Sequence, residues 1–131
     1  ADVDDFFTGL FSTALEPDEM VVSVTLKKPL TATYLKFDQP ASRFALVGLA
    51  VAQHAHHFRV AITGLGHGAI RWHEAEDALT QATHITHVTL AHALKTLHLD
   101  PERASGDLHA SAVYRVHIAK VLCERAVQKL F

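Results

Sequence analysis

The chain has 131 residues, enough for one domain with a buried core, and a formal net charge of −2 at pH 7. About half of the residues (49%) are hydrophobic and 20% are charged, as in ordinary globular proteins. The small net charge gives no basic surface for nucleic acid or for an anionic membrane. A single cysteine, Cys123, excludes an internal disulfide framework, and no apolar run approaches the roughly 20 residues that span a bilayer. We therefore expect a soluble, cytoplasmic protein that neither binds nucleic acid nor inserts into a membrane.

The first 19 residues read as a linker-like entry segment rather than as part of a compact core. Apolar residues between Phe6 and Phe11 form a short turn, which either packs on a neighbouring domain or caps the core of this one. The stretch Glu16–Glu19 holds a proline and predicts a turn. Residues Met20–Leu26 then predict the first strand, with small, mildly polar side chains on the face that carries Val21, Ser23 and Thr25.

Two strands joined by a polar elbow follow. Residues Ala32–Phe37 predict a short strand, and Asp38–Arg43 form the elbow, where a proline removes a backbone donor. The apolar run Phe44–Ala52 predicts a strand that is covered on both faces. Lys36 then stands near the end of one strand and Phe44 at the start of the next. Residue type alone favours a surface lysine and a core phenylalanine.

A hairpin and an extended segment complete the predicted sheet. The polar stretch Gln53–His57 predicts the hairpin turn, and the alternation in Phe58–Thr63 predicts the returning strand. The glycine-rich stretch Gly64–Gly68 lacks the Gly-Lys-Ser/Thr of a phosphate loop, so its glycines are interpreted as a turn out of the sheet. Residues Ala69–Trp72 look extended.

The remainder of the chain has helical periodicity. Residues Glu74–Gln81 and Thr86–His98 predict two helices, and a third starts at Asp107 or Ser111 and reaches about Leu130. The apolar stripe predicted for the third helix comprises Ala112, Val113, Val116, Ala119, Leu122, Cys123, Ala126, Val127 and Leu130, and the opposite side carries Arg115, Lys120, Glu124, Arg125 and Lys129. The fold class that follows is α+β: a three- or four-stranded antiparallel sheet packed against about three helices.

No catalytic or metal-binding motif emerges from the residues. The sequence has no Ser-His-Asp signature and no acidic pair in a recognisable apolar pocket. Its eleven histidines include no helical i, i+4 pair with a following acid, so they are predicted to be solvated turn and helix residues. A histidine-rich metal-binding module remains as the least favoured interpretation of the chain. We accordingly assign no catalytic and no metal-binding residues.

Three motifs together resemble one family. They are Tyr-Leu-Lys-Phe-x-x-Pro-Ala-Ser-Arg-Phe-Ala-Leu-Val-Gly over 34–48, the entry segment Phe6–Glu19 with its Leu-x-Pro-x-Glu turn, and Asp107–Arg115 before the last helix. In this order they resemble the C-terminal domain of the FAD-binding medium subunit of aerobic carbon monoxide dehydrogenases. The same domain occurs in the wider xanthine dehydrogenase and molybdenum hydroxylase family.

The resemblance implies a single domain over residues 1–131 that works with FAD but does not hold it alone. In the family, the loops that bind the FAD pyrophosphate belong to two N-terminal subdomains, which this sequence does not contain, so weak or no FAD binding is expected of the chain by itself. Val21 matches a residue that touches FAD by apolar contact, and Lys36 matches a lysine that contacts it. Phe44 stands where family members have a tyrosine over the isoalloxazine ring.

The resemblance also implies a role in electron transfer from molybdenum and iron–sulfur centres to FAD. The implied partners are the N-terminal FAD-binding portion of the same subunit, an iron–sulfur subunit and a molybdopterin subunit. The chain would then be part of an oxidoreductase without being catalytic alone. The alternative is a standalone interaction or scaffold domain that binds no flavin. In either case self-association is expected if the flavin-facing surface is left exposed.

Overall fold

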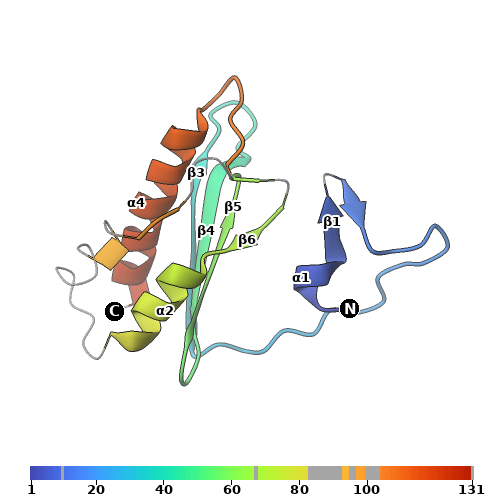
Figure 1. The fold of residues 1–131 in the computed structure, drawn as a ribbon, viewed down its shortest axis with the longest axis horizontal. Coiled ribbons are helices and arrows are strands. Elements are labelled where there is room, and N and C mark those ends of the chain that lie inside the picture. The colour runs from blue at the N-terminus through green and yellow to red at the C-terminus, as the bar shows by residue number, and fades with distance from the viewer. Residues whose placement is uncertain (10, 67, 83–92, 95–96, 100–103, 131) are drawn as a thin grey trace.

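A four-stranded antiparallel sheet with helices on one face forms the body of the protein (Figure 1). This computed structural model describes residues 1–9, 11–66, 68–82, 93–94, 97–99 and 104–130. The strand order β3-β4-β5-β6 follows the chain, with β3 at Thr31–Asp38, β4 at Ala45–Gln53, β5 at Phe58–Thr63 and β6 at Ile70–Arg71. The α+β prediction is thereby confirmed.

The helices α2 (His73–Gln81) and α4 (Ala112–Leu130) pack on the sheet, α2 against β5 and α4 against β3 and β4. The predicted helices over 74–81 and up to Leu130 are confirmed. The helix predicted for Thr86–His98 falls mostly outside the described residues. Within the described part of the chain, none of the helices combines the length and apolar character that crossing a bilayer requires.

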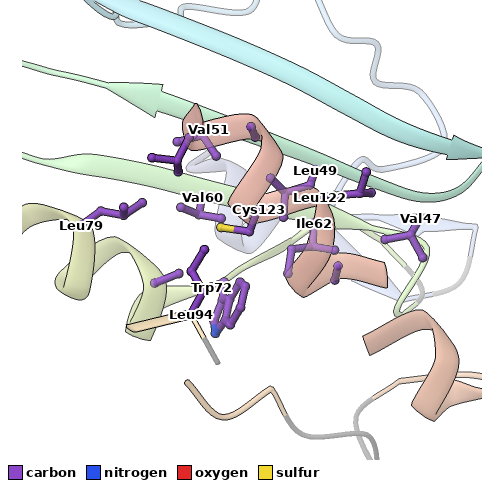
Figure 2. Close-up of a cluster of buried hydrophobic side chains, with 14 of the residues drawn as sticks. Val47, Leu49, Val51, Val60, Ile62, Trp72, Leu79, Leu94, Leu122 and Cys123 are labelled. Atoms are coloured by element: carbon purple, nitrogen blue, oxygen red, sulfur yellow. The ribbon is translucent and has the colours of Figure 1, made fainter. Parts of the chain in front are cut away.

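The core lies between the helices and the sheet face that alternate strand residues supply (Figure 2). Figure 2 shows Val47, Leu49 and Val51 of β4 beside Val60 and Ile62 of β5, with Leu122 and Cys123 of α4 over them. Trp72, Leu79 and Leu94 close one side of this cluster. Cys123 is fully buried as predicted, and burial raises the pKa of its thiol to about 12. It is therefore an unreactive packing residue.

The opposite sheet face, here called the open face, carries mostly small side chains. Its members are Ala32, Tyr34, Lys36, Gly48, Ala50, Ala52, Arg59, Ala61, Thr63 and Arg71. On this face Gly48 is buried but Ala50 and Ala52 are only half-buried, so the prediction that the Phe44–Ala52 run is covered on both faces is wrong for its second half. The run is apolar because its helix-facing residues are valine and leucine, while Gly48, Ala50 and Ala52 form the other face.

A buried carboxylate closes the edge of the sheet beyond the short β6. Glu76 of α2 accepts hydrogen bonds from the Val60 N–H at 3.0 Å and from the Arg71 Nε at 2.9 Å, and it also pairs with Arg59. Burial acts to raise the pKa of Glu76, but these hydrogen bonds and the two guanidinium charges outweigh it and hold the pKa below its usual value. Glu76 thus replaces a missing strand partner for β5.

The N-terminal residues lie apart from this body (Figure 1). They form a short helix, α1 (Val3–Phe6), and a two-stranded ribbon made of β1 (Phe7–Gly9) and β2 (Ser12–Thr13). The strand predicted for Met20–Leu26 is wrong, because this segment forms no strand and the structure places it along no sheet edge among the described residues. A β-prone sequence adopts a strand only where a neighbour satisfies its backbone groups.

Candidate functional site

The loop that joins β3 to β4 fixes the position of Lys36. The Lys36 ammonium donates a 2.8 Å hydrogen bond to the Arg43 carbonyl oxygen and forms a 2.9 Å ion pair with Asp38. Its side chain is still partly exposed. Lys36 is therefore held by the loop at the end of its own strand instead of extending freely into solvent.

Hydrogen bonds within the loop make this conformation specific. The Gln39 N–H donates to the Phe44 carbonyl at 2.8 Å, and the Arg43 N–H returns a 2.9 Å bond to Gln39. The Gln39 side-chain oxygen accepts from both the N–H and the hydroxyl of Ser42. Arg43 has φ of 61°, a left-handed conformation that non-glycine residues seldom adopt. The elbow predicted for Asp38–Arg43 is thus a compact, internally bonded loop.

Phe44 is exposed rather than buried. Strand β4 begins one residue later than predicted, at Ala45, and the register is irregular next to Asp38, so Phe44 belongs to the loop. Its side chain is 78% exposed. The core position that residue type favours is therefore wrong. Because Lys36 bonds the carbonyl of Arg43, which directly precedes Phe44, the structure brings these two residues to the same end of the sheet.

Other exposed rings lie at this end. Phe37, next to Lys36 in β3, meets Tyr114 of α4 edge-on, with ring centroids 6.3 Å apart. Both side chains keep a large exposed fraction. The loop end of the sheet therefore carries exposed aromatic surface on its helix side as well as the Phe44 ring in the loop.

Arg115 connects the elements that meet at this end. Its guanidinium donates to the Leu46 carbonyl at 2.7 Å and the Gly64 carbonyl at 2.8 Å, and it pairs with Asp107 at 2.7 Å. The prediction that Arg115 lies opposite the apolar stripe is wrong, because Arg115 is buried; Val113, assigned to the stripe, is exposed. The hydrogen bond from Arg115, together with the backbone N–H of His109, holds the pKa of Asp107 at about 2.

Close backbone approach explains the glycine that follows β5. Gly64 has φ of 83°, and a Cβ there would overlap the Leu46 carbonyl oxygen. That oxygen and the Gly64 carbonyl both accept hydrogen bonds from Arg115. Gly64 thus turns the chain out of the sheet, and Arg115 bonds this turn to the start of β4.

On the open face, Tyr34 lies over the middle of the sheet beside Lys36. Gly48 pairs with Lys36 on one side and Thr63 on the other. A Cβ at Gly48 would meet the hydroxyls of Tyr34 and Thr63. The absence of a side chain at Gly48 is therefore what lets the Tyr34 ring lie across the strand toward Thr63.

Val21 is not brought to this end of the sheet. It lies in the segment before Leu30, half-exposed, and that segment reaches β3 at the end opposite the 39–44 loop (Figure 1). The segment that carries Val21 therefore meets the sheet at the end away from Lys36 and Phe44. The three residues assigned from the family resemblance thus separate into a pair, Lys36 and Phe44, and a distant third.

The histidines in the hairpin turn interact with each other. The rings of His54 and His57 stack with centroids 4.7 Å apart, and the His54 N–H donates to the His57 carbonyl at 2.9 Å. Partial burial, followed by the charges of Arg59 and His54, lowers the pKa of His57. The described residues contain no group of three or more His, Cys, Asp or Glu side chains that could hold a metal ion.

Sequence reasoning missed the two buried charged residues, Arg115 and Glu76. Arg115 lies four residues before Ala119 and seven before Leu122, so helical spacing already places it on the buried side of α4. Glu76 lies three residues before the buried Leu79. In both cases the charge of the residue was given more weight than its position on the helix.

Comparison with known proteins agrees with this geometry. The family model described as the CO dehydrogenase flavoprotein C-terminal domain matches residues 32–130. Among solved structures, quinoline 2-oxidoreductase from Pseudomonas putida 86 is similar with a TM-score of 0.77 and 26% identity over 95% of this chain. The match covers 45% of the chain of that protein, so the present chain spans less than half of its length. A search of curated proteins finds no match.

The family model covers about three-quarters of the chain. It includes the Lys36 loop, α4 and the whole four-stranded sheet apart from the first residue of β3. The four-stranded sheet, the helices and the motif around Lys36 are thus features of one family. The chain belongs to the carbon monoxide dehydrogenase flavoprotein C-terminal domain family.

Proposed function

We propose that this chain is the C-terminal module of the FAD subunit of a molybdenum hydroxylase-type oxidoreductase, and that its β3–β4 loop end covers the flavin. The observation that carries the proposal is the pairing of Lys36 with the loop that exposes Phe44, within a domain of this family. FAD, when bound in the complete subunit, supplies the redox chemistry.

The residues at the loop end fit a flavin. An ammonium group has three N–H donors, and Lys36 donates one to the Arg43 carbonyl oxygen while it forms an ion pair with Asp38, which leaves donor capacity for a carbonyl or phosphate oxygen. The exposed Phe44 ring offers an apolar face on which an aromatic ring system stacks. Phenylalanine keeps the stacking surface that tyrosine has but has no hydroxyl. This chain thus binds and orients the flavin edge and excludes water from it.

The isolated chain should bind FAD weakly or not at all. One fixed ammonium and one ring face would contribute roughly a few kcal/mol of interaction free energy. That contribution is smaller than the free-energy cost of immobilising the cofactor. Most donors to the pyrophosphate are expected from the FAD-binding portion that precedes this domain in the family. A fluorescence titration of the 131-residue chain that gave a Kd below about 1 μM would contradict this division of labour.

Docking of the redox partners follows from the same assignment. The partners are the N-terminal FAD-binding portion, an iron–sulfur subunit and a molybdopterin subunit, which together pass electrons to FAD. As the family resemblance implies, we place substrate oxidation in the molybdenum subunit and assign this chain no substrate-binding residue. Val21 serves as an apolar contact only when its segment is moved to the flavin by the rest of the subunit.

Retention of FAD tests the proposal. In the assembled subunit, Lys36→Ala should lower the FAD-to-protein ratio after gel filtration, because a donor to the cofactor is lost. Lys129→Ala is the matched control, since Lys129 is exposed near the far end of α4, and it should leave the ratio unchanged. Equal flavin content in wild type and Lys36→Ala would contradict the role of Lys36. A subunit that assembles without flavin would identify the chain as an interaction or scaffold domain.

A further inference from the structure

Two hydroxyl groups converge on one place on the open face. Lys36, Gly48 and Thr63 occupy facing positions on β3, β4 and β5, so they form one row across the sheet. Tyr34 precedes Lys36 by two residues and shares its face. A Cβ at residue 48 would meet the hydroxyl oxygens of both Tyr34 and Thr63, so both hydroxyls lie directly above Gly48. They form a polar pair in the row of the sheet that Lys36 begins.

The domain itself uses neither hydroxyl. Among the described residues, neither the Tyr34 Oη nor the Thr63 Oγ1 atom has a hydrogen-bond partner, and the two do not bond to each other. The Tyr34 side chain is 54% exposed, and Thr63 is exposed as well. A hydroxyl group can both donate and accept hydrogen bonds. The hydrogen-bonding capacity of both groups is therefore directed outward, to whatever covers this part of the open face.

Gly48 makes this arrangement possible. A glycine inside a strand weakens the strand, and it often marks a place where a ligand approaches the backbone closely. Gly48 is buried here beneath the end of the Tyr34 ring. The ring thus lies on the sheet instead of extending into solvent, which holds its hydroxyl in place. The Lys36 ammonium is held in turn by the Arg43 carbonyl at 2.8 Å. The fold therefore sets the positions of the hydroxyl pair and of the ammonium on one face of the sheet.

We propose that the Tyr34 and Thr63 hydroxyls bind the pyrimidine edge of the flavin ring system in the complete subunit. This edge presents two carbonyl oxygens on either side of one N–H group, so it needs both donors and an acceptor. A hydroxyl pair supplies both, whereas the FAD pyrophosphate only accepts and would leave the acceptor capacity of the hydroxyls unused. The inference rests on the proposed function, from which it takes FAD. It adds two cofactor contacts to those of Lys36 and Phe44.

Removing each hydroxyl with little change in side-chain shape tests the inference. Tyr34→Phe and Thr63→Val, made in the assembled flavoprotein subunit, should each weaken FAD binding about threefold to tenfold, as one lost hydrogen bond predicts. The flavin carbonyl stretch in the infrared difference spectrum should also move to higher wavenumber, because a carbonyl that loses a hydrogen bond becomes stiffer.

Matched controls remove the same groups elsewhere. Tyr114→Phe on α4 and Thr33→Val on the opposite face of β3 should change neither FAD affinity nor the carbonyl stretch. Tyr34→Phe and Thr63→Val in the isolated chain should melt within about 2 °C of wild type, since neither hydroxyl has a partner among the described residues.

Three results would overturn the inference. FAD affinity in both variants equal to that of the controls would show that neither hydroxyl touches the cofactor. Weaker binding with an unchanged carbonyl stretch would show that the hydroxyls bind another part of FAD, and a large drop in melting temperature of the isolated variants would show a structural role. Lys36→Ala separates this inference from the proposed function. If Lys36→Ala loses FAD while both hydroxyl variants keep it, the inference alone fails, whereas an assembled subunit without flavin refutes both.

Discussion

The Lys36 ammonium donates to the carbonyl oxygen of Arg43 across the β3–β4 loop, at a distance of 2.8 Å. This bond makes the lysine and the loop that ends in Phe44 one unit. A change in either should therefore alter the position of the other. Since the Lys36 side chain is more than a third exposed, its loss should cost at most about 1 kcal/mol of folding stability. A marked loss of bound FAD in a Lys36 variant would then reflect a lost contact with the cofactor and not unfolding of the domain.

Replacing Arg115 with methionine should destabilise the domain by about 2–4 kcal/mol, because the buried carbonyls of Leu46 and Gly64 would lose their donor. The measurement is urea denaturation of the isolated chain. Arg125→Met is the control, since Arg125 is exposed on the same helix, and it should shift stability by less than about 0.5 kcal/mol. Equal, small effects of both variants would refute the role assigned to Arg115.

Gly64→Ala should cost about 3 kcal/mol, because it combines a strained φ of 83° with overlap between the new Cβ and the Leu46 carbonyl. Gly68→Ala provides the control, because a Cβ at Gly68 meets no atom within 4 Å. Its stability should stay within about 0.5 kcal/mol of wild type. Equal stability of Gly64→Ala and Gly68→Ala would contradict the close approach of the Gly64 backbone to the Leu46 carbonyl.

Stability should depend on pH through Asp107. The folded protein lowers the pKa of this carboxyl from 3.8 to about 2. The stabilisation that Asp107 provides is therefore fully present at pH values above the pKa of the unfolded state, and it is lost as the pH falls through the pKa of the folded state. Wild-type stability should therefore decline between about pH 4 and pH 2 more steeply than that of Asp107→Asn. Parallel denaturation curves for the two proteins across this range would show that the ion pair with Arg115 contributes nothing.

Alternation along the strands was enough to predict the sheet. Leu35, Leu49 and Ile62 occupy facing register positions on β3, β4 and β5, as a period of two requires. The same period misled at Met20–Leu26, because a strand depends on a neighbour that the local sequence does not reveal. What a pattern predicts is the side-chain face of a strand, whereas the existence of the strand depends on a partner edge.

The candidate site was less accessible to sequence reasoning. The sequence favoured a core position for Phe44, but the left-handed Arg43 extends the loop by one residue and leaves the ring outside the ladder. The contact between Lys36 and Arg43 spans seven residues and depends on that loop conformation. The family resemblance indicated the residue pair, and the loop conformation explains why the two residues lie together.

Accessibility of the flavin to iodide in the assembled subunit tests the central claim most directly. If the Phe44 ring covers the flavin, Phe44→Ala should increase iodide quenching of flavin fluorescence severalfold and shift the flavin midpoint potential, because water reaches the ring. Phe44→Tyr keeps the ring face and should stay close to wild type, while Phe44→Leu, which keeps apolar volume without a ring, should fall between them. Identical quenching and potential in all four proteins would contradict the account and would place the flavin away from the loop that Lys36 and Phe44 share.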